Sequence, residues 1–425
     1  MNRREFTKLL GMAGLGATAS LPLGIAQAIE PYSGPFYINL AAIGGWDVTS
    51  FCDPKANITG ERTINNWADS ASIEQVGNIA YAPVGNNKAF FERFYQDMLV
   101  INGIDTQTNS HDDGRRHTWS GRLGFGYPSF GAIVSNVIAP ELPLSLVHAS
   151  GYNETAGIAR FSRLQGPYII KNLVNDSTVQ DGNKVFGLFE DSELDLITQY
   201  QDERLARLAG SNQLLPRQIE GINSLQLANA TRDDLNLFAD LLPNTFEGSR
   251  SNTAAQLALI AYQSGLCVCA QLGLNGFDTH QDHDADHFNA MDELTDLITF
   301  IFDTAEKGGF ADKIVITLGS DFGRKPFYNP GGGKDHWPIG SAMFIQQGAA
   351  WGNRVVGATD ELHNALKINP GTLQVDSSSA GVGLQPKHLQ QAIRELAGVD
   401  RSATALQFPL DAEDVDFFNP SKQTA

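Results

Sequence analysis

The sequence predicts an α/β protein with a mostly parallel central sheet, helices on both faces of that sheet, and a largely helical insertion. Two observations predict this fold class. Short apolar runs bounded by turn residues recur along the chain, and segments with the periodicity of helices lie between them. This alternation is typical of a mostly parallel sheet that packs between two layers of helices.

The apolar runs have the length of buried strands, and the periodic segments between them have the length of ordinary helices. Residues 151–250 differ from both, because they are more polar and mostly helical in pattern. We predict that this segment is an insertion or a cap over the sheet. The predicted strands are 36–45, 97–105, 142–150, 265–274, 313–320 and 341–348, and the predicted helices are 87–98, 251–265 and 284–308.

Residues 1–28 have the pattern of a twin-arginine export signal. Arg3 and Arg4 precede an apolar stretch that ends in Ala-Gln-Ala. Glycines and Pro22 interrupt the stretch, which is too short to span a membrane well, so no stable membrane anchor is expected. We expect residues 29–425 to form a single domain, with the twin-arginine translocase as partner during export and a periplasmic or otherwise exported location.

Charge and cysteine content exclude several classes of protein. The formal net charge is −18, which does not favour binding to nucleic acid or to anionic lipid. The three cysteines are an odd number, so a complete disulfide framework is not expected.

Aspartates and histidines cluster where the predicted strands end. Ligands of open α/β sheets gather beyond the carboxyl ends of the strands, so these side chains are expected to meet at one edge. Carboxylates together with imidazoles suit one or two divalent ions of zinc, manganese or iron better than calcium. The candidate metal ligands are Asp47, Asp278, His280, His283, Asp321 and His336.

Each of these residues also has a plainer interpretation. An aspartate after a strand is often a helix N-cap, and a single histidine such as His336 is more often a structural hydrogen-bonding residue than a ligand. The aspartates at 282, 284 and 286 fit the acidic first turn of a long helix. What favours a metal site is that five strand-end loops carry such residues together.

Ser110 is the candidate nucleophile. It follows a predicted strand and precedes a helical segment, where a metal can activate a hydroxyl and free backbone amides attract an anion. Arg115 and Arg116 are candidates for contacts to phosphate or sulfate oxygens. A serine that only caps the helix explains Ser110 equally well, and Thr108 is an alternative hydroxyl.

Taken together, the motifs resemble those of the DUF1501 family, exported proteins of the alkaline phosphatase–sulfatase superfamily. The resemblance covers nearly all of residues 29–425 and rests on the order of the segments "GGWD", "NSHDDGRRHTWSG", "GFDTHQDH", "SDFGRKP" and "GGGKDHWP". It implies an alkaline phosphatase-like fold with metal ions at the strand ends.

The resemblance also implies roles for individual residues. One metal would be bound by Asp47, Ser110 and Asp321, and a second by Asp278, by His280 or His283, and by His336. In the superfamily's phosphatases a histidine follows the later aspartate, whereas Phe322 follows Asp321 here. His111 or His117 would have to supply the missing ligand.

The function predicted from these features is an exported, metal-dependent hydrolase of phosphate or sulfate esters that uses a metal-activated serine. Its partner would be an anionic small-molecule or polymer ester. The alternative is a non-catalytic, metal-containing periplasmic binding or assembly protein on a degenerate hydrolase scaffold. A metal-dependent phosphomutase or transferase is a third hypothesis, since one scaffold hosts several reactions.

Overall fold

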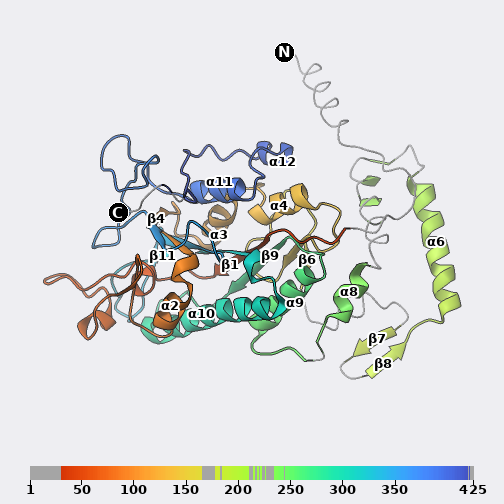
Figure 1. Ribbon diagram of the computed structural model, residues 1–425, viewed down its shortest axis with the longest axis horizontal. Helices are drawn as coiled ribbons and strands as arrows, with labels where there is room; N and C mark the ends of the chain where they lie inside the picture. The colour runs from red at the N-terminus through yellow and green to blue at the C-terminus, as the bar shows by residue number, and fades with distance from the viewer. Residues whose placement is uncertain are drawn as a thin grey trace, which may run out of the picture. The chain divides into compact units, whose positions relative to one another are not determined.

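An eight-stranded sheet forms the centre of the fold, in the order β14-β4-β13-β10-β1-β9-β5-β6 (Figure 1). The structure is a computed structural model that describes residues 30–164, 178–181, 184–209, 214–215, 218–219, 221–222, 225, 234–243, 245–419 and 421. The predicted export signal lies outside the described residues. The strands of this sheet are β1 (Phe36–Ala42), β4 (Met98–Asp105), β5 (Leu146–His148), β6 (Ser162–Arg163), β9 (Cys269–Leu274), β10 (Ile314–Ser320), β13 (Ile339–Ile345) and β14 (Arg354–Val356).

Most neighbouring strands in this sheet are parallel. β1 pairs in parallel with β9 and β10, β5 with β6 and β9, and β4 with β14. β13 runs antiparallel to both β10 and β4. The predicted α/β class with a mostly parallel sheet is therefore confirmed, and all six predicted strands are present with somewhat different ends.

Short strands were not predicted, because two to four residues are too few to show a periodicity. They include β6 and β14 at the edges of the main sheet. The remaining ones form two-stranded pairs: β2 (Glu74–Val76) with β3 (Ile79–Tyr81), β7 (Thr178–Asp181) with β8 (Lys184–Gly187), and β11 (Gly323–Arg324) with β12 (His336–Trp337).

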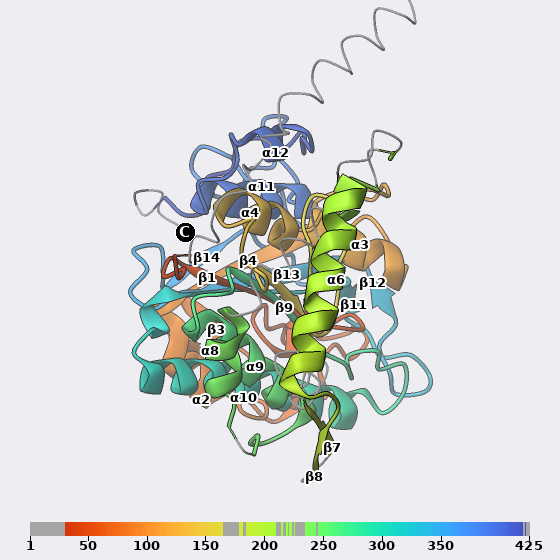
Figure 2. The same ribbon diagram turned by 90° about the vertical axis from the view of Figure 1, so that its right-hand side faces the viewer.

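Helices cover both faces of the sheet (Figures 1 and 2). One layer contains α2 (Asn87–Phe94), α9 (Arg250–Gln263) and α10 (His283–Gly308). The other contains α3 (His111–Ser120), α4 (Phe130–Ile138), α11 (Pro386–Leu396) and α12 (Ala403–Leu406). Single 3-10 turns are η1 (Val48–Ser50), η2 (Asn66–Asp69), η3 (Tyr95–Asp97) and η4 (Ala311–Lys313).

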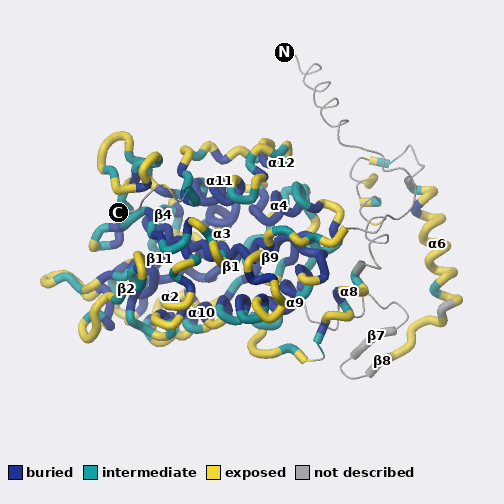
Figure 3. The backbone as a smooth tube through the Cα atoms, in the orientation of Figure 1, coloured by how far each residue is buried: buried dark blue, intermediate teal, exposed yellow. Residues whose placement is uncertain are grey.

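The core lies between the sheet and these helices. Every residue of β1 and β10 is buried, as expected for central parallel strands that are covered on both faces (Figure 3). α10 contributes Leu294, Ile298 and Ile301, whose spacing of three to four residues places them on one face.

In the segment predicted to be an insertion, the described residues include the helices α6 (Asp191–Ala209) and α8 (Asp234–Asp240). α6 is largely exposed along its length (Figure 3). The predicted role of residues 151–250 as a cap stays a prediction. None of the helices in the described part of the chain is both long and apolar enough to span a bilayer.

Strand direction decides which loops meet. β1, β9 and β10 are parallel, and β4 runs in the same direction because it is antiparallel to β13, as β10 is. Their carboxyl ends therefore share one edge of the sheet. β13 runs the other way, so the loop that precedes it, with His336, arrives at this same edge.

Candidate metal centre

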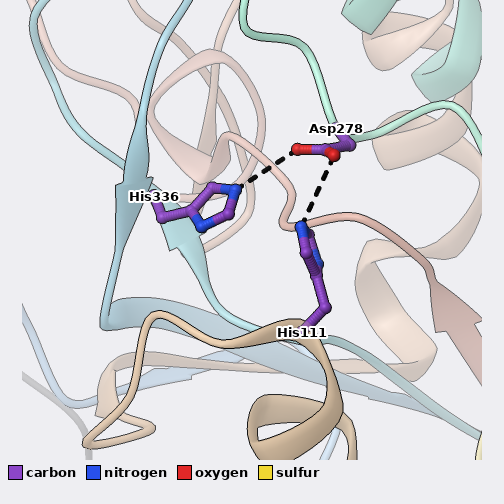
Figure 4. Close-up of side chains that lie close together, drawn as sticks. All are labelled: His111, Asp278 and His336. Atoms are coloured by element: carbon purple, nitrogen blue, oxygen red, sulfur yellow. Dashed lines mark hydrogen bonds and ion pairs between the residues drawn. The ribbon is translucent and has the colours of Figure 1, made fainter.

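Three histidines surround the carboxylate of Asp278 at this edge. Asp278 lies in the loop after β9, His336 begins β12, and His111 is the first residue of α3 (Figure 4). His280 lies in the same loop as Asp278. The Nε2 atom of His280 lies 3.2 Å from Asp278 Oδ1, and that of His336 lies 3.3 Å from the same oxygen. The Nε2 atom of His111 lies 3.5 Å from Asp278 Oδ2.

The other ring nitrogen of each histidine faces an oxygen. Nδ1 of His111 lies 2.8 Å from Asp321 Oδ2, and Nδ1 of His336 lies 2.8 Å from the carbonyl oxygen of Asn109. Nδ1 of His280 lies 3.3 Å from Asp335 Oδ1. Because these oxygens accept hydrogen bonds, Nδ1 of each neutral ring is assigned the proton, and the Nε2 lone pairs face Asp278.

This arrangement fits a divalent metal ion. The Nε2 atom of His111 is buried and makes no hydrogen bond within the described structure. The Nε2 atoms of His280 and His336 lie only 3.0 Å apart, which places two lone pairs in close opposition unless a cation or a proton lies between them. Donor atoms on a tetrahedral zinc ion at about 2.0–2.1 Å are about 3.3 Å from one another, close to the 3.3 Å between His336 Nε2 and Asp278 Oδ1.

The protonation states of the site also suit a metal. Burial lowers the pKa of His336, which favours the neutral imidazole that binds metals. Partial burial alone would raise the pKa of Asp278, but the hydrogen bond and the charge of Arg324 outweigh it and lower that pKa. The carboxylate is therefore ionised at neutral pH. The ligand atoms of His111, Asp278 and His336 all lie within 4.8 Å of one another.

Arg324 joins the loops that carry these ligands. Its side chain is fully buried, and Nη2 donates to Asp278 Oδ1 at 2.6 Å. The same guanidinium donates to backbone oxygens in three separate loops. The acceptors are the carbonyl oxygens of Gly44, Gly45, Phe277 and Lys334.

A second polar cluster lies behind the first and is closed to solvent. The backbone N–H of Asp47 donates to His287 Nε2 at 2.8 Å, and His287 Nδ1 lies 3.1 Å from Thr279 Oγ1. Thr279 Oγ1 lies 2.7 Å from His283 Nδ1, and His283 Nε2 lies 3.0 Å from Asp47 Oδ2. One proton assignment satisfies this whole ring of hydrogen bonds, with both imidazoles neutral.

The pKa shifts in this buried cluster agree with that assignment. Burial lowers the pKa of His283 and lowers that of His287 well below its usual value. Burial alone would raise the pKa of Asp47, but the Lys334 ammonium, 2.7 Å from Oδ2, holds it well below its usual range. Asp47 is therefore a carboxylate with a cation already beside it.

The six predicted ligands thus separate into three groups. Asp278, His280 and His336 lie together in the outer cluster. Asp321 lies behind His111, whose ring it contacts. Asp47 and His283 face each other in the buried cluster instead. Of the two histidines suggested to supply a missing ligand, His111 joins the outer cluster, whereas the buried His117 contacts the carbonyl oxygen of Thr106.

The predicted catalytic residues all lie on or beside α3. Ser110 is the N-cap residue and is exposed, and its side chain makes no capping hydrogen bond. Arg115 pairs with Asp112 on the same helix. Arg116 pairs with Asp113 at 2.7 Å and lies 3.7 Å from the centre of the Phe125 ring. Arg115 Nε also donates to the carbonyl oxygen of His111 at 3.3 Å, and the roles of both arginines stay predictions.

Lys334 and Arg324 were not predicted as parts of the site. Both stand inside motifs that were singled out, "GGGKDHWP" and "SDFGRKP". A lysine or arginine in a loop is normally exposed, and nothing local marks these two as fully buried. The only local signal was their position next to candidate ligands.

Comparisons with known proteins give one family and several distant structures. The model of the family described as "Protein of unknown function (DUF1501)" matches residues 201–377, a range that includes Asp278, His280 and His336. His111 and Asp47 lie outside the matched range. No curated protein matches the chain in sequence.

Similar solved structures have low identity to the chain. Ps i-CgsB in complex with k-i-k-neocarrahexaose has a TM-score of 0.40 and 10% identity, and the match covers 91% of this chain and 76% of that one. The PsFucS1 sulfatase from Pseudoalteromonas sp. has a TM-score of 0.34 and 12% identity over 78% and 66% of the two chains. A putative sulfatase from Bacteroides thetaiotaomicron has a TM-score of 0.35 and 9% identity over 87% and 72%.

Proposed function

The chain belongs to the DUF1501 family, whose function is unknown, and we propose that it is an exported metal-dependent hydrolase of phosphate or sulfate esters. A single divalent ion would be held by His111, Asp278 and His336, and His280 Nε2 lies beside it, 3.0 Å from that of His336. One observation carries this proposal: three Nε2 atoms face the same carboxylate while each Nδ1 faces an oxygen. Such outer hydrogen bonds orient metal-binding histidines in general.

Bound zinc, manganese or iron acts as a Lewis acid, which lowers the pKa of a hydroxyl or water and offsets charge that develops on an ester oxygen. The chain's own residues supply access and orientation. The side chains of Asp278 and His280 are about half exposed, at 51% and 46%, so a substrate can reach the centre from solvent. Ser110 directly precedes His111, is exposed, and is the proposed nucleophile.

The first turn of α3 adds a favourable field for an anionic ester. Backbone N–H groups at the start of a helix carry partial positive charge and attract phosphate or sulfate. Of the two predicted arginines, Arg115 is the better candidate to contact the anion, because its pairing with Asp112 lies near the protein surface. Arg116 is buried and also donates to the carbonyl oxygen of Leu123.

The test combines metal content with turnover on full-length protein recovered after native export. We expect one equivalent of zinc, manganese or iron per chain, loss of this metal in His336→Ala, and retention in the matched control His117→Gln. Hydrolysis of aryl phosphate or aryl sulfate should fall by 10²-fold or more in Ser110→Ala, an order-of-magnitude expectation for loss of a nucleophile. The mass of the exported protein should correspond to a chain that begins after Ala28.

Two results would contradict this proposal in different ways. Wild-type protein that takes up no divalent metal after loading would exclude the metal centre. Metal that binds without turnover of any ester would instead support the alternative, an exported metal-containing binding protein. One observation favours that alternative: Arg115 and Arg116 both pair with aspartates of their own helix, which compete with an anionic substrate for them.

A further inference from the structure

We propose that the Lys334 ammonium is a permanent internal cation that occupies the place of a second metal ion beside Asp47, so that the chain binds one metal rather than two. The part of this inference that gives one bound metal ion per chain rests on the proposed metal centre. The inference itself concerns a different cluster, however, and can be tested separately.

Lys334 is surrounded by oxygen atoms as a bound cation would be. Its Nζ atom lies 2.7 Å from Asp47 Oδ2 and 2.8 Å from Asn65 Oδ1. It lies 3.3 Å from Thr49 Oγ1 and 5.0 Å from the centre of the Tyr328 ring. The side chains of Lys334 and Asp47 are both fully buried, so water does not compensate either charge. Each of the two charges therefore depends on the other.

The atoms that would bind a metal beside Asp47 are already occupied. From the residues that the structure describes, Oδ1 accepts from the backbone N–H of Thr49 at 3.0 Å and lies 2.6 Å from Thr49 Oγ1. Oδ2 faces Lys334, His283 and the hydroxyl of Ser50. His283 Nε2 carries the proton that it donates to Asp47, so this nitrogen has no lone pair for a metal.

Electrostatics lead to the same conclusion. Asp47 and Lys334 together are neutral, and both imidazoles of the buried cluster are neutral by their hydrogen bonds. A divalent ion added here would place two uncompensated positive charges in a closed interior beside an ammonium group. Burying unpaired charge is strongly unfavourable. The predicted two-metal arrangement with Asp47 as a ligand therefore does not fit this chain.

The same lysine links the buried cluster to the outer one. Its backbone N–H donates to the carbonyl oxygen of Thr279 at 3.1 Å, and its own carbonyl accepts from Arg324 at 2.9 Å. Thr279 and Lys334 are buried, whereas their neighbours Asp278, His280 and His336 belong to the outer cluster. The inner ion pair thus fixes two backbone segments that present metal ligands.

The experiment counts metal in the mature chain after loading with zinc or with manganese and extensive dialysis. It compares wild type with the double variant Asp47→Asn/Lys334→Met, in which the pair is replaced by neutral side chains of similar size, and with His336→Ala. We expect one equivalent in wild type, one in the double variant and none in His336→Ala. Two equivalents in wild type, with one lost in the double variant, would overturn the inference.

Urea unfolding of the metal-free proteins tests the pair without reference to metal. Lys334→Met leaves Asp47 as an uncompensated buried charge and should shift the midpoint to much lower urea. The double variant should recover most of the lost stability. If Lys334→Met does not fold at all but the double variant does, that result supports the inference equally. If the effects of Asp47→Asn and Lys334→Met simply add, the two residues are not coupled and the inference fails.

This second measurement separates the two proposals. Wild-type protein without metal would exclude the proposed function, whereas a strong coupling in urea would still identify Lys334 as the cation that Asp47 requires.

Discussion

At the scale of single residues, Asp321 shows how a predicted ligand acquires a different role. Its side chain is buried, and Oδ2 lies 2.8 Å from His111 Nδ1 and accepts from the backbone N–H of Gly44 at 3.2 Å. This carboxylate therefore lies behind His111 rather than beside Asp278. Carboxylates in this position hold the ring of a metal-binding histidine and raise its basicity.

We expect Asp321→Asn to weaken metal binding by about 10- to 100-fold while the protein stays folded, as is usual when such an outer partner is replaced. The amide still accepts a hydrogen bond from Nδ1 but supplies no negative charge. Competition with a chelator of known affinity measures the change. Asp312→Asn, at an exposed aspartate that pairs with Lys313, is the control. Equal affinities in both variants would rule out this role for Asp321.

At the scale of elements, Gly114 sets how closely α3 approaches the end of β10. A Cβ atom at this position would lie 2.3 Å from the carbonyl oxygen of Asp321. That contact is with backbone, which cannot turn away as a side chain can. Glycine in a helix costs about 1 kcal/mol relative to alanine, so close packing is the physical reason for it here. The position of α3 in turn places His111.

Gly114→Ala is therefore expected to destabilise the protein, although it raises helix propensity. Overpacking costs about 1–3 kcal/mol, which outweighs the gain in propensity. The metal affinity should fall as well, because His111 moves with the helix. Urea unfolding and metal competition measure the two effects. Gly124→Ala, where a Cβ meets nothing within 4 Å, is the matched control and should change neither quantity. A more stable Gly114→Ala protein would contradict this account.

Across the whole molecule, the buried ring of hydrogen bonds ties the loop after β1 to the distant stretch that runs from the loop after β9 into α10. Asp47 follows β1, Thr279 follows β9, and His283 and His287 belong to the first turns of α10. Protonation of either imidazole would remove one hydrogen-bond acceptor from this ring of hydrogen bonds and would add a positive charge near Lys334. The folded protein therefore requires both rings to be neutral.

This requirement predicts how the free energy of unfolding depends on pH. Burial lowers the pKa of both histidines below the ordinary value of 6.5, so the unfolded chain binds protons first as pH falls. The stabilisation is complete above about pH 6.5 and decreases below it, by up to about 1.4 kcal/mol per pH unit for each histidine. The pKa of Asp47 is also lowered, so this residue adds a further loss of stability only at more acidic pH.

Urea unfolding at pH 7.5, 6.5 and 5.5 checks this expectation. Wild type should keep nearly the same stability between pH 7.5 and about pH 6.5 and lose stability between pH 6.5 and 5.5. His287→Gln should be less stable at pH 7.5 but should show a shallower pH dependence, since one buried titrating group is gone. The same slope in both proteins would mean that His287 does not remain neutral in the folded state.

Much of the fold followed from local patterns in the sequence. The apolar runs at 36–45 and 313–320 correspond to β1 and β10, and the periodic segment 284–308 corresponds to α10. A strand buried on both faces is a continuous apolar run, and a helix buried on one face has apolar residues every three to four positions, so both can be predicted from the order of residues. The residues around Asp278 were singled out in part. Asp278, His280 and His336 were named, whereas His111 was suggested only as a substitute for a missing ligand.

Local patterns in the chain define the helices and strands and place acids and histidines at strand ends, since both depend on neighbouring residues. Which of those residues meet depends on how the strands and helices pack in three dimensions. The antiparallel course of β13 brings Lys334 and His336 to the edge where the other strands end. Lys334 then pairs with Asp47, far away in sequence, and Asp321 with His111. Charge pairing acts through space, and a buried cation next to a carboxylate decides whether that carboxylate can still bind a metal.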